Sequence, residues 1–255
     1  MLQQLHQMQK NFDRVSKLIS HYGFCSRRDA EKFITMGKVK INGEIYTNFI
    51  LPDDEIKKIE VDGKELFKPE LRIWVLNKSE GIICSSKRQN NKKIIFDILP
   101  KNMPRVISVG RLDLNSEGLL ILTNSPIFAE YLENPKNQIS RRYEVKISGN
   151  ISDKNLNAAK EGILIENINY GSMNITKKTN KENNNWLEIE IFEGKNREIR
   201  KILSHFGHMI KKLRRIQYGP FFLKNLTKNK IIELDSEKIN KKLVSLGLNV
   251  EDYSR

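Results

Sequence analysis

The order of the apolar patterns along the chain limits the fold more than any other feature of the sequence. Helix-like and strand-like segments follow one another without regular β-α-β alternation, so a doubly wound parallel sheet is disfavoured. The pattern predicts an α+β fold with a central, largely antiparallel sheet. The predicted strands are 71–78, 106–109, 119–123, 142–147, 162–165 and 186–192, and the predicted helices are 127–133, 153–161 and 197–206.

The N-terminal segment has its own local pattern. A helical stripe starts at Val15 and stops at Gly23, and a second helix starts after Ser26 and stops at Gly37. Residues 39–46 alternate around an Asn-Gly turn and predict a β-hairpin, and 59–63 predict another strand and turn. We therefore expect a tail at 1–11, a small domain at 12–68, a larger domain at 71–240 and a charged tail at 241–255.

The charge of the chain indicates a polyanionic partner. Lys and Arg number 45 against 31 Asp and Glu, which gives a formal net charge of +14, and nucleic acid is the most common partner of such a surplus. Arg27 and Arg28 lie in the first turn of the second predicted helix, where the helix dipole disfavours cations. Either an anion binds there or these side chains form an ordinary solvated face.

Several classes of protein receive no support from the sequence. The two cysteines, Cys25 and Cys84, are far apart, so neither a metal site nor a disulfide is expected. The nucleotide-binding motifs GxGxxG and GxxxxGK[ST] do not occur, and we expect no cofactor. No signal peptide and no apolar run of about 18 residues is present. These features predict a cytoplasmic protein.

Three segments carry candidate functional residues. Asp113 follows a predicted strand in a short loop, where an aspartate commonly forms only a turn or cap. Residues 195–215 hold eight basic side chains against one acidic one, and helical spacing places Arg197 and Arg200 on one face. Tyr143 lies in a predicted strand, where a tyrosine is usually part of the core.

These segments resemble the motifs of two known families. Residues 12–63 resemble the S4 RNA-binding domain. The motifs Gly110-Arg-Leu-Asp113, the Tyr143 strand and Glu193-Gly-Lys-Asn-Arg-Glu-Ile-Arg200 resemble those of the RsuA-type pseudouridine synthases. Residues 95–100, the Asn-Arg-Glu triplet at 196–198 and residues 215–219 are most similar to the RluB-like branch, which acts on large-subunit rRNA. Ser116 stands where the family usually has threonine, and it keeps the hydroxyl group.

The resemblance implies that the protein converts uridine to pseudouridine in ribosomal RNA, with no cofactor and no metal. It implies that Asp113 is the catalytic carboxylate, that Arg200 is its partner with Arg197 as the alternative, and that Tyr143 stacks on the uracil. Arg111 would fill the gap left by the flipped nucleotide. The residues expected to contact RNA are Arg27, Arg28, Lys38, Arg111, Lys195, Asn196 and Arg197.

Some alternatives stay open at this stage. The target is expected in 23S rRNA, with 16S rRNA as the second choice, and the partner is free rRNA or a pre-ribosomal particle. A non-catalytic RNA-binding or ribosome-assembly protein would need no Asp113, Tyr143 and Arg200 set. A metal-dependent nuclease would need clustered ligands, and only His205 and His208 have helical spacing. Nothing in the sequence indicates a subunit interface, so a monomer is expected.

Overall fold

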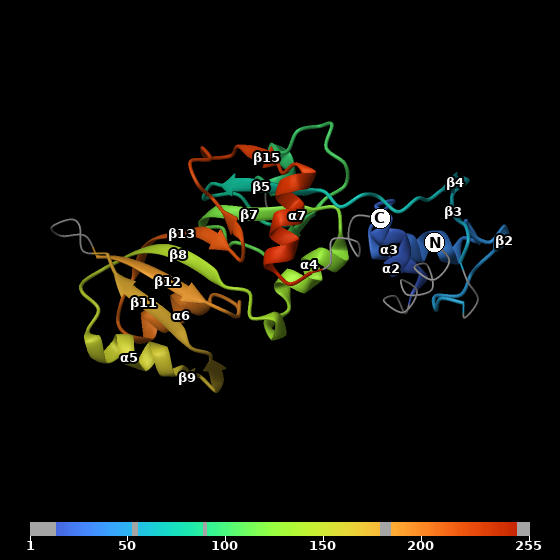
Figure 1. Ribbon diagram of the computed structural model, residues 1–255. Coiled ribbons are helices and arrows are strands. Elements are labelled where there is room, and N and C mark those ends of the chain that lie inside the picture. The colour runs from blue at the N-terminus through green and yellow to red at the C-terminus, as the bar shows by residue number, and fades with distance from the viewer. Residues whose placement is uncertain (1–13, 53–55, 89–90, 179–184, 249–255) are drawn as a thin grey trace.

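The computed structural model describes residues 14–52, 56–88, 91–178 and 185–248. A small N-terminal domain lies beside one end of a larger domain that is built around an extended sheet (Figure 1). Ile127, at the start of α4 in the larger domain, packs against the core of the small one. The α+β class and the largely antiparallel sheet predicted from the sequence are confirmed.

The small domain forms where local sequence signals are strong. Helix α2 (Val15–His21) precedes α3 (Arg27–Thr35), and the Ser26 hydroxyl caps α3 by accepting a hydrogen bond from the Asp29 amide at 3.2 Å. Strands β1 (Val39–Ile41) and β2 (Glu44–Ile45) form the predicted hairpin, and β3 (Ile59–Val61) and β4 (Lys64–Glu65) complete a sheet in the order β2-β1-β3-β4. Asn42 and Gly43 both have positive φ angles, as a tight hairpin turn requires.

The larger sheet has nine strands in the main order β11-β12-β8-β13-β7-β5-β15, with β14 pairing with β13 and β6 with β7. Its strands are β5 (Ile73–Lys78), β6 (Ile107–Val109), β7 (Glu117–Thr123), β8 (Arg141–Ile147), β11 (Met173–Lys177), β12 (Trp186–Ile191), β13 (Ile210–Tyr218), β14 (Phe221–Phe222) and β15 (Ile231–Glu233). The β13–β7 pair is parallel. At Gly118 of β7, a Cβ atom would lie 2.3 Å from the Arg215 carbonyl oxygen, so only glycine permits this approach of the two strands.

Helices cover the sheet on two sides. Helices α4 (Pro126–Glu133) and α7 (Ser236–Ser245) pack with the face of β5 and β7 that carries Val75 and Ile121. Helices α5 (Asp153–Glu161) and α6 (Glu198–His205) pack with β8, β11, β12 and β13 in a second core. The hairpin β9 (Ile163–Ile165) and β10 (Ile168–Tyr170) lies beside α6, and short 3-10 helices occupy Ile95–Ile98 and Pro135–Asn137.

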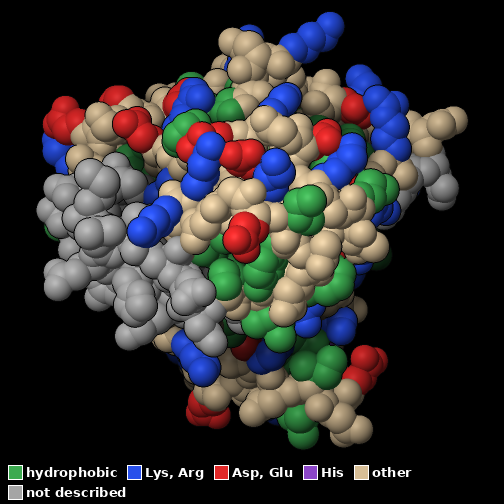
Figure 2. Space-filling view, turned by 90° about the vertical axis from the view of Figure 1, so that its right-hand side faces the viewer, with side chains coloured by type: hydrophobic (Ala, Val, Ile, Leu, Met, Phe, Trp, Pro, Cys, Tyr) green, Lys and Arg blue, Asp and Glu red, His purple; other side chains and the backbone are tan. Residues whose placement is uncertain are grey.

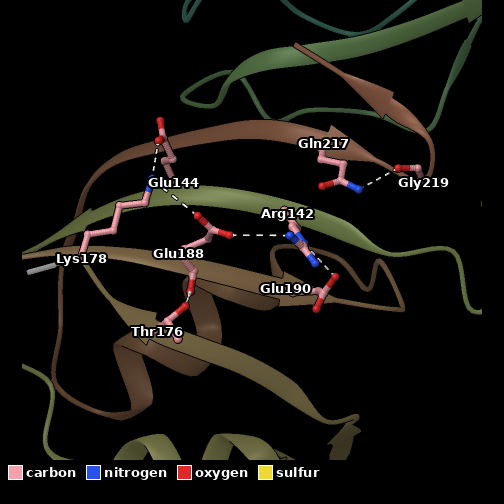
Figure 3. Close-up of polar contacts among 8 residues, drawn as sticks. All are labelled: Arg142, Glu144, Thr176, Lys178, Glu188, Glu190, Gln217 and Gly219. Carbon is pink, nitrogen blue, oxygen red and sulfur yellow. Dashed lines mark hydrogen bonds and ion pairs between the residues drawn. The ribbon is translucent and has the colours of Figure 1, made fainter. Parts of the chain in front are cut away.

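Alternation along β8 separates a polar face of the sheet from the face that bears the pocket. Arg142 pairs with Glu190 at 2.9 Å, and Lys178 pairs with Glu144 at 2.6 Å, on the polar face shown in Figure 3. The intervening residues Arg141 and Tyr143 are buried on the opposite face. This alternation points Tyr143 toward the side of the sheet where α6 lies.

Three expectations differ from the structure. Strand β13, which lies between β8 and β7, was not predicted, because its basic residues were grouped with α6 in one cluster at 195–215. Helix α7 crosses the expected boundary at 240, and its Leu243 is buried, so the larger domain continues past the point where the charged tail was expected. Arg197 precedes α6 in a left-handed conformation instead of lying within the helix. The N-terminal tail 1–11 lies outside the described residues.

Candidate active site

A pocket of about 880 Å³ opens on the face of the sheet that carries Tyr143. Its walls include the loop at 110–116 (the Asp113 loop), parts of β8 and β13, the turn at 193–197, and the first turns of α6. All three expected catalytic residues, Asp113, Tyr143 and Arg200, line it. Arg111, Lys195, Asn196 and Arg197 line it as well, so the pocket joins motifs that are far apart in sequence.

Two arginines approach the carboxylate of Asp113. The Asp113 Oδ2 atom lies 3.4 Å from Arg197 Nη1 and 3.6 Å from Arg200 Nε. The Asp113 side chain is 34% exposed, whereas that of Arg200 is 15% exposed and that of Arg197 49%. The carboxylate therefore faces the pocket with a partly buried guanidinium on one side and a solvated one on the other.

Arg200 also holds the Asp113 loop. Its Nη2 atom donates to the Asn115 carbonyl at 2.7 Å and to the Ser116 hydroxyl at 3.3 Å. Burial lowers the pKa of the Arg200 guanidinium, and the neighbouring charge of Arg197 lowers it further. Arg200 therefore fixes both the backbone of the loop and the position of its carboxylate.

Lys78 is a functional residue that the sequence analysis did not single out. It ends β5 and is fully buried, with 0% of its surface exposed. Its ammonium group donates to the carbonyl oxygens of Ser79, Asp113 and Ser116 at 3.1, 3.1 and 2.7 Å. Burial lowers the pKa of Lys78. The signal in the sequence was a lysine at the end of a mostly apolar strand, which is costly to bury without such partners.

The remaining contacts fix the two ends of the loop. The Gly110 amide donates to Glu133 Oε1 of α4 at 2.7 Å, and the Leu112 amide contacts Cys84 Sγ at 3.4 Å. The Gly81 amide donates to the Leu114 carbonyl at 2.9 Å. Together with Lys78 and Arg200, these contacts make the Asp113 loop a rigid support, as a catalytic group requires.

Tyr143 and two buried arginines form the floor of the pocket. Tyr143 is 8% exposed, so little of its surface reaches the cavity that it lines. Arg215 is buried and donates to the Leu119 carbonyl at 2.8 Å. Arg141 donates to the carbonyl oxygens of Phe192 and Glu193 at 3.2 and 3.1 Å, and so ties β8 to the turn at 193–197.

The residues expected to contact RNA fall into two groups. Arg111, Lys195, Asn196 and Arg197 surround the pocket, and Lys195 forms an ion pair with Glu193. Arg27, Arg28 and Lys38 are exposed on the small domain, and Lys38 pairs with Asp62 at 2.8 Å. Figure 2 shows Lys and Arg side chains distributed over one side of the molecule, with Asp and Glu among them. A second hollow of about 520 Å³ on the small domain is lined by Arg14, Arg28, Lys32 and Phe49, among others.

Within the described ranges, no group of three or more His, Cys, Asp or Glu side chains could hold a metal ion. His208 contacts the Ser148 carbonyl at 2.9 Å through its Nδ1 atom, and the ring of His205 packs against Phe206. None of the described helices is long and apolar enough to cross a membrane.

Replacing Lys78 with methionine tests the support of the loop. Methionine keeps most of the apolar stem but leaves three buried carbonyl oxygens without their shared donor. We expect the free energy of unfolding to fall by about 3 kcal/mol, since each unsatisfied buried group costs roughly 1–3 kcal/mol. Chemical denaturation measures this change. Lys238→Met, at an exposed position on α7, is the matched control, and an equal loss in both variants would contradict the role of Lys78.

Comparison with known proteins shows which family this chain belongs to. Residues 72–205 match the family described as RNA pseudouridylate synthase, and residues 13–54 match the S4 domain. The chain therefore belongs to the RNA pseudouridine synthases, which are isomerases. The matched region contains Asp113, Tyr143 and Arg200. The resemblance inferred from the sequence motifs is confirmed at the level of the family and of the S4 domain.

Several relatives match over nearly their whole length. An uncharacterized RNA pseudouridine synthase of Rickettsia felis is 42% identical over 89% of this chain and 99% of its own. Proteins named ribosomal large subunit pseudouridine synthase B, from Buchnera aphidicola and Bacillus subtilis, are 36% and 32% identical and cover 92% and 90% of this chain, and 98% and 95% of their own. A crystal structure of a pseudouridylate synthase shares the fold, with a TM-score of 0.64 at 24% identity, and covers 90% of this chain and 99% of its own.

Proposed function

We propose that this protein converts a specific uridine of 23S rRNA to pseudouridine and that Asp113 is its catalytic carboxylate. The observation that carries the proposal is the Asp113 carboxylate in the pocket, 3.4 Å from Arg197 and 3.6 Å from Arg200. The loop that bears it is fixed by Lys78, Glu133 and Arg200 through its backbone. A held carboxylate suits nucleophilic or base catalysis.

The reaction rearranges bonds within one nucleotide. The N1–C1′ bond breaks, the uracil turns, C5 joins C1′, the proton on C5 leaves to water, and N1 takes up a proton. No electrons enter or leave, so the balance needs no redox partner. In the proposed roles, Asp113 attacks the nucleotide or removes a proton from its ribose, Arg200 holds the carboxylate in position, and the Tyr143 ring packs against the uracil.

The target base must leave its stack to reach the pocket, which costs a few kcal/mol. In this proposal, Arg111 occupies the space that the base vacates. Lys195, Asn196 and Arg197 then contact the phosphates next to the flipped nucleotide, and Arg27, Arg28 and Lys38 contact a more distant part of the RNA. The protein would act as a monomer on rRNA or a pre-ribosomal particle in the cytoplasm.

The choice of 23S rRNA rests on the relatives that carry the large-subunit name. Mapping pseudouridines in the rRNA of cells with and without this gene tests it. We expect one 23S position to lose its pseudouridine when the gene is deleted and to regain it when the wild-type gene is restored. Loss at a 16S position would contradict the choice of target, and loss at no position would contradict the proposed substrate.

Replacing Arg27 and Arg28 with alanine tests the contact between the small domain and RNA. If both side chains bind phosphates, the slope of log affinity against log salt should flatten by about one unit for each phosphate that the variant no longer neutralises. Filter binding to unmodified 23S rRNA at several salt concentrations measures the slope. The control variant, Lys154→Ala with Lys160→Ala on α5, removes the same charge from exposed positions and should keep the wild-type slope. An equal change in both variants, or in neither, would contradict RNA binding at Arg27 and Arg28.

A further inference from the structure

The turn at 193–197 presents the second arginine of the pocket and is itself strained. It connects β12 with α6 and ends at Arg197, which has φ 52° and ψ 31°. This left-handed conformation is unfavourable for a residue that has a side chain. Arg197 therefore needs support from its surroundings to keep its guanidinium near Asp113. Two glutamates lie at the ends of this turn, Glu193 at its start and Glu198 directly after it.

The Glu193 side chain is partly buried and Glu198 is almost wholly buried. The Glu198 residue is 3% exposed, and the side chain of Glu193 is 20% exposed. Glu198 Oε2 accepts a hydrogen bond from the Lys195 amide at 3.1 Å, while no donor among the described residues reaches its buried Oε1 atom. The Glu198 carboxyl group lies within hydrogen-bonding reach of the Glu193 carboxyl group. Two ionised carboxylates only accept, so a hydrogen bond between them needs a proton on one of them.

The surroundings assign the proton to Glu198. Glu193 accepts from the Gly171 amide at 2.7 Å and forms an ion pair with Lys195. Burial alone would raise the pKa of Glu193. The bonds with Lys195, the Gly171 amide and Glu198 outweigh burial and hold this pKa below its usual value. Burial, reinforced by the charge of Glu193, raises the pKa of Glu198 to about 8. At neutral pH the pair therefore consists of one carboxylate and one carboxylic acid.

The other charged and titratable groups around the pair come from the turn itself, β8, β10 and α6. Lys195, on the turn itself, also donates to the Asn169 carbonyl at 2.8 Å, and its ammonium lies 5.8 Å from the centre of the Tyr170 ring. Arg141 of β8 donates to the Glu193 carbonyl and not to its carboxylate. Arg197 and Arg200 point to Asp113. Lys195 is thus the cation in direct contact with the pair, and it pairs with Glu193.

We propose that Glu198 is a positioning residue, whose protonated carboxyl group donates a hydrogen bond to Glu193. This bond holds the turn that carries Arg197 and the first turn of α6, which carries Arg200. The inference rests on the proposed role of Asp113 and its arginines. Through the Gly171 amide, the same pair also fixes the turn to the end of the β9–β10 hairpin. Loss of the proton would place two negative charges together in a buried space and push the ends of the turn apart.

The test is the pH dependence of single-turnover pseudouridine formation on unmodified 23S rRNA transcribed in vitro. Uridine labelled with tritium at C5 releases its label to water as the new bond forms. The wild-type rate should fall as the pH rises through about 8. The free energy of unfolding of the wild-type protein should fall as the pH rises from about 4.5 to about 8 and then level off, because over this range Glu198 is ionised in the unfolded chain but still protonated in the fold.

Two variants of Glu198 separate the proton from the side chain. Glu198→Gln keeps a donor for Glu193 and an acceptor for the Lys195 amide, and it cannot ionise. Its rate at pH 7 should lie within about threefold of wild type, and the decline near pH 8 should disappear. Glu198→Ala loses both bonds and should be slower by at least about tenfold at pH 7, a loss of about 1.4 kcal/mol in transition-state stabilisation.

Each outcome decides the question. A decline near pH 8 that persists in Glu198→Gln would overturn the proposal, because another group would then be titrating. A loss of a hundredfold or more in Glu198→Gln at pH 7 would also overturn it, because the carboxyl group itself would then be required. Activity in an Asp113→Asn variant would refute the proposed catalytic role instead, and this result does not depend on the Glu198 comparison.

Discussion

Asp113→Asn is expected to reduce pseudouridine formation by roughly 10⁴-fold or more, the scale on which enzymes lose activity when a nucleophile or base is removed. Asparagine keeps the size of the side chain, and the loop stays fixed through its backbone by Lys78, Glu133 and Arg200. The variant should therefore fold normally. Its affinity for RNA should stay within about threefold of wild type, because a single side-chain charge changes little among many phosphate contacts.

Tritium release from unmodified 23S rRNA measures the rate, and filter binding measures the affinity. Asp153→Asn is the matched control, because Asp153 lies on α5 with its side chain 86% exposed and pairs only with Lys177 among the described contacts. The control should retain full activity. An Asp113→Asn variant that still turned over at a rate near wild type would remove the proposed catalytic role of this residue.

Arg200→Ala is expected to slow the reaction by about 10²–10³-fold. The change removes the partly buried guanidinium 3.6 Å from the Asp113 carboxylate and the hydrogen bonds to Asn115 and Ser116. Removing one preorganised donor from an active site typically costs about 3–4 kcal/mol. Lysine at this position should restore little of the rate, because a single ammonium group does not reproduce the fork of contacts made by a guanidinium.

Arg197→Ala is the informative comparison for Arg200. Its guanidinium lies 3.4 Å from Asp113 but is 49% exposed, so solvent screens the interaction. We expect a smaller loss, of about tenfold. Near-normal rates in Arg200→Ala together with a large loss in Arg197→Ala would transfer the role of catalytic partner to Arg197.

The parts of the fold that depend on local sequence could be predicted. The capping serine at position 26 and the Asn42-Gly43 turn act over three or four residues, and the structure has both as predicted. Strand β13 could not be predicted in this way, because its alternation is hidden. Basic residues occupy both faces: Arg214 pairs with Glu144 on the polar face, whereas Arg215 is buried against Tyr218 and the Leu119 carbonyl.

In the candidate active site, too, some features could be predicted from the sequence and others depend on how distant segments pack. The sequence motifs predicted Asp113 and both arginines, and the fold brings Arg197 to Asp113 across 84 residues of chain. The motifs did not show that Arg200 holds the loop backbone, nor that Lys78 donates to three carbonyl groups. Both depend on how β5, the Asp113 loop and α6 pack together. The Glu193–Glu198 pair was missed because its shared proton follows from burial, which the spacing of charges does not reveal.

A structure of the protein bound to an unmodified 23S rRNA fragment tests the central claim most directly. The Asp113→Asn variant would hold the substrate without turning it over. The account predicts one uridine outside its stack, with its C1′ atom within about 4 Å of the side chain at position 113, near the distance of a reactive contact, and its base against Tyr143. A flipped uridine bound elsewhere, or a sugar far from this side chain with Arg200 turned away from the loop, would contradict it.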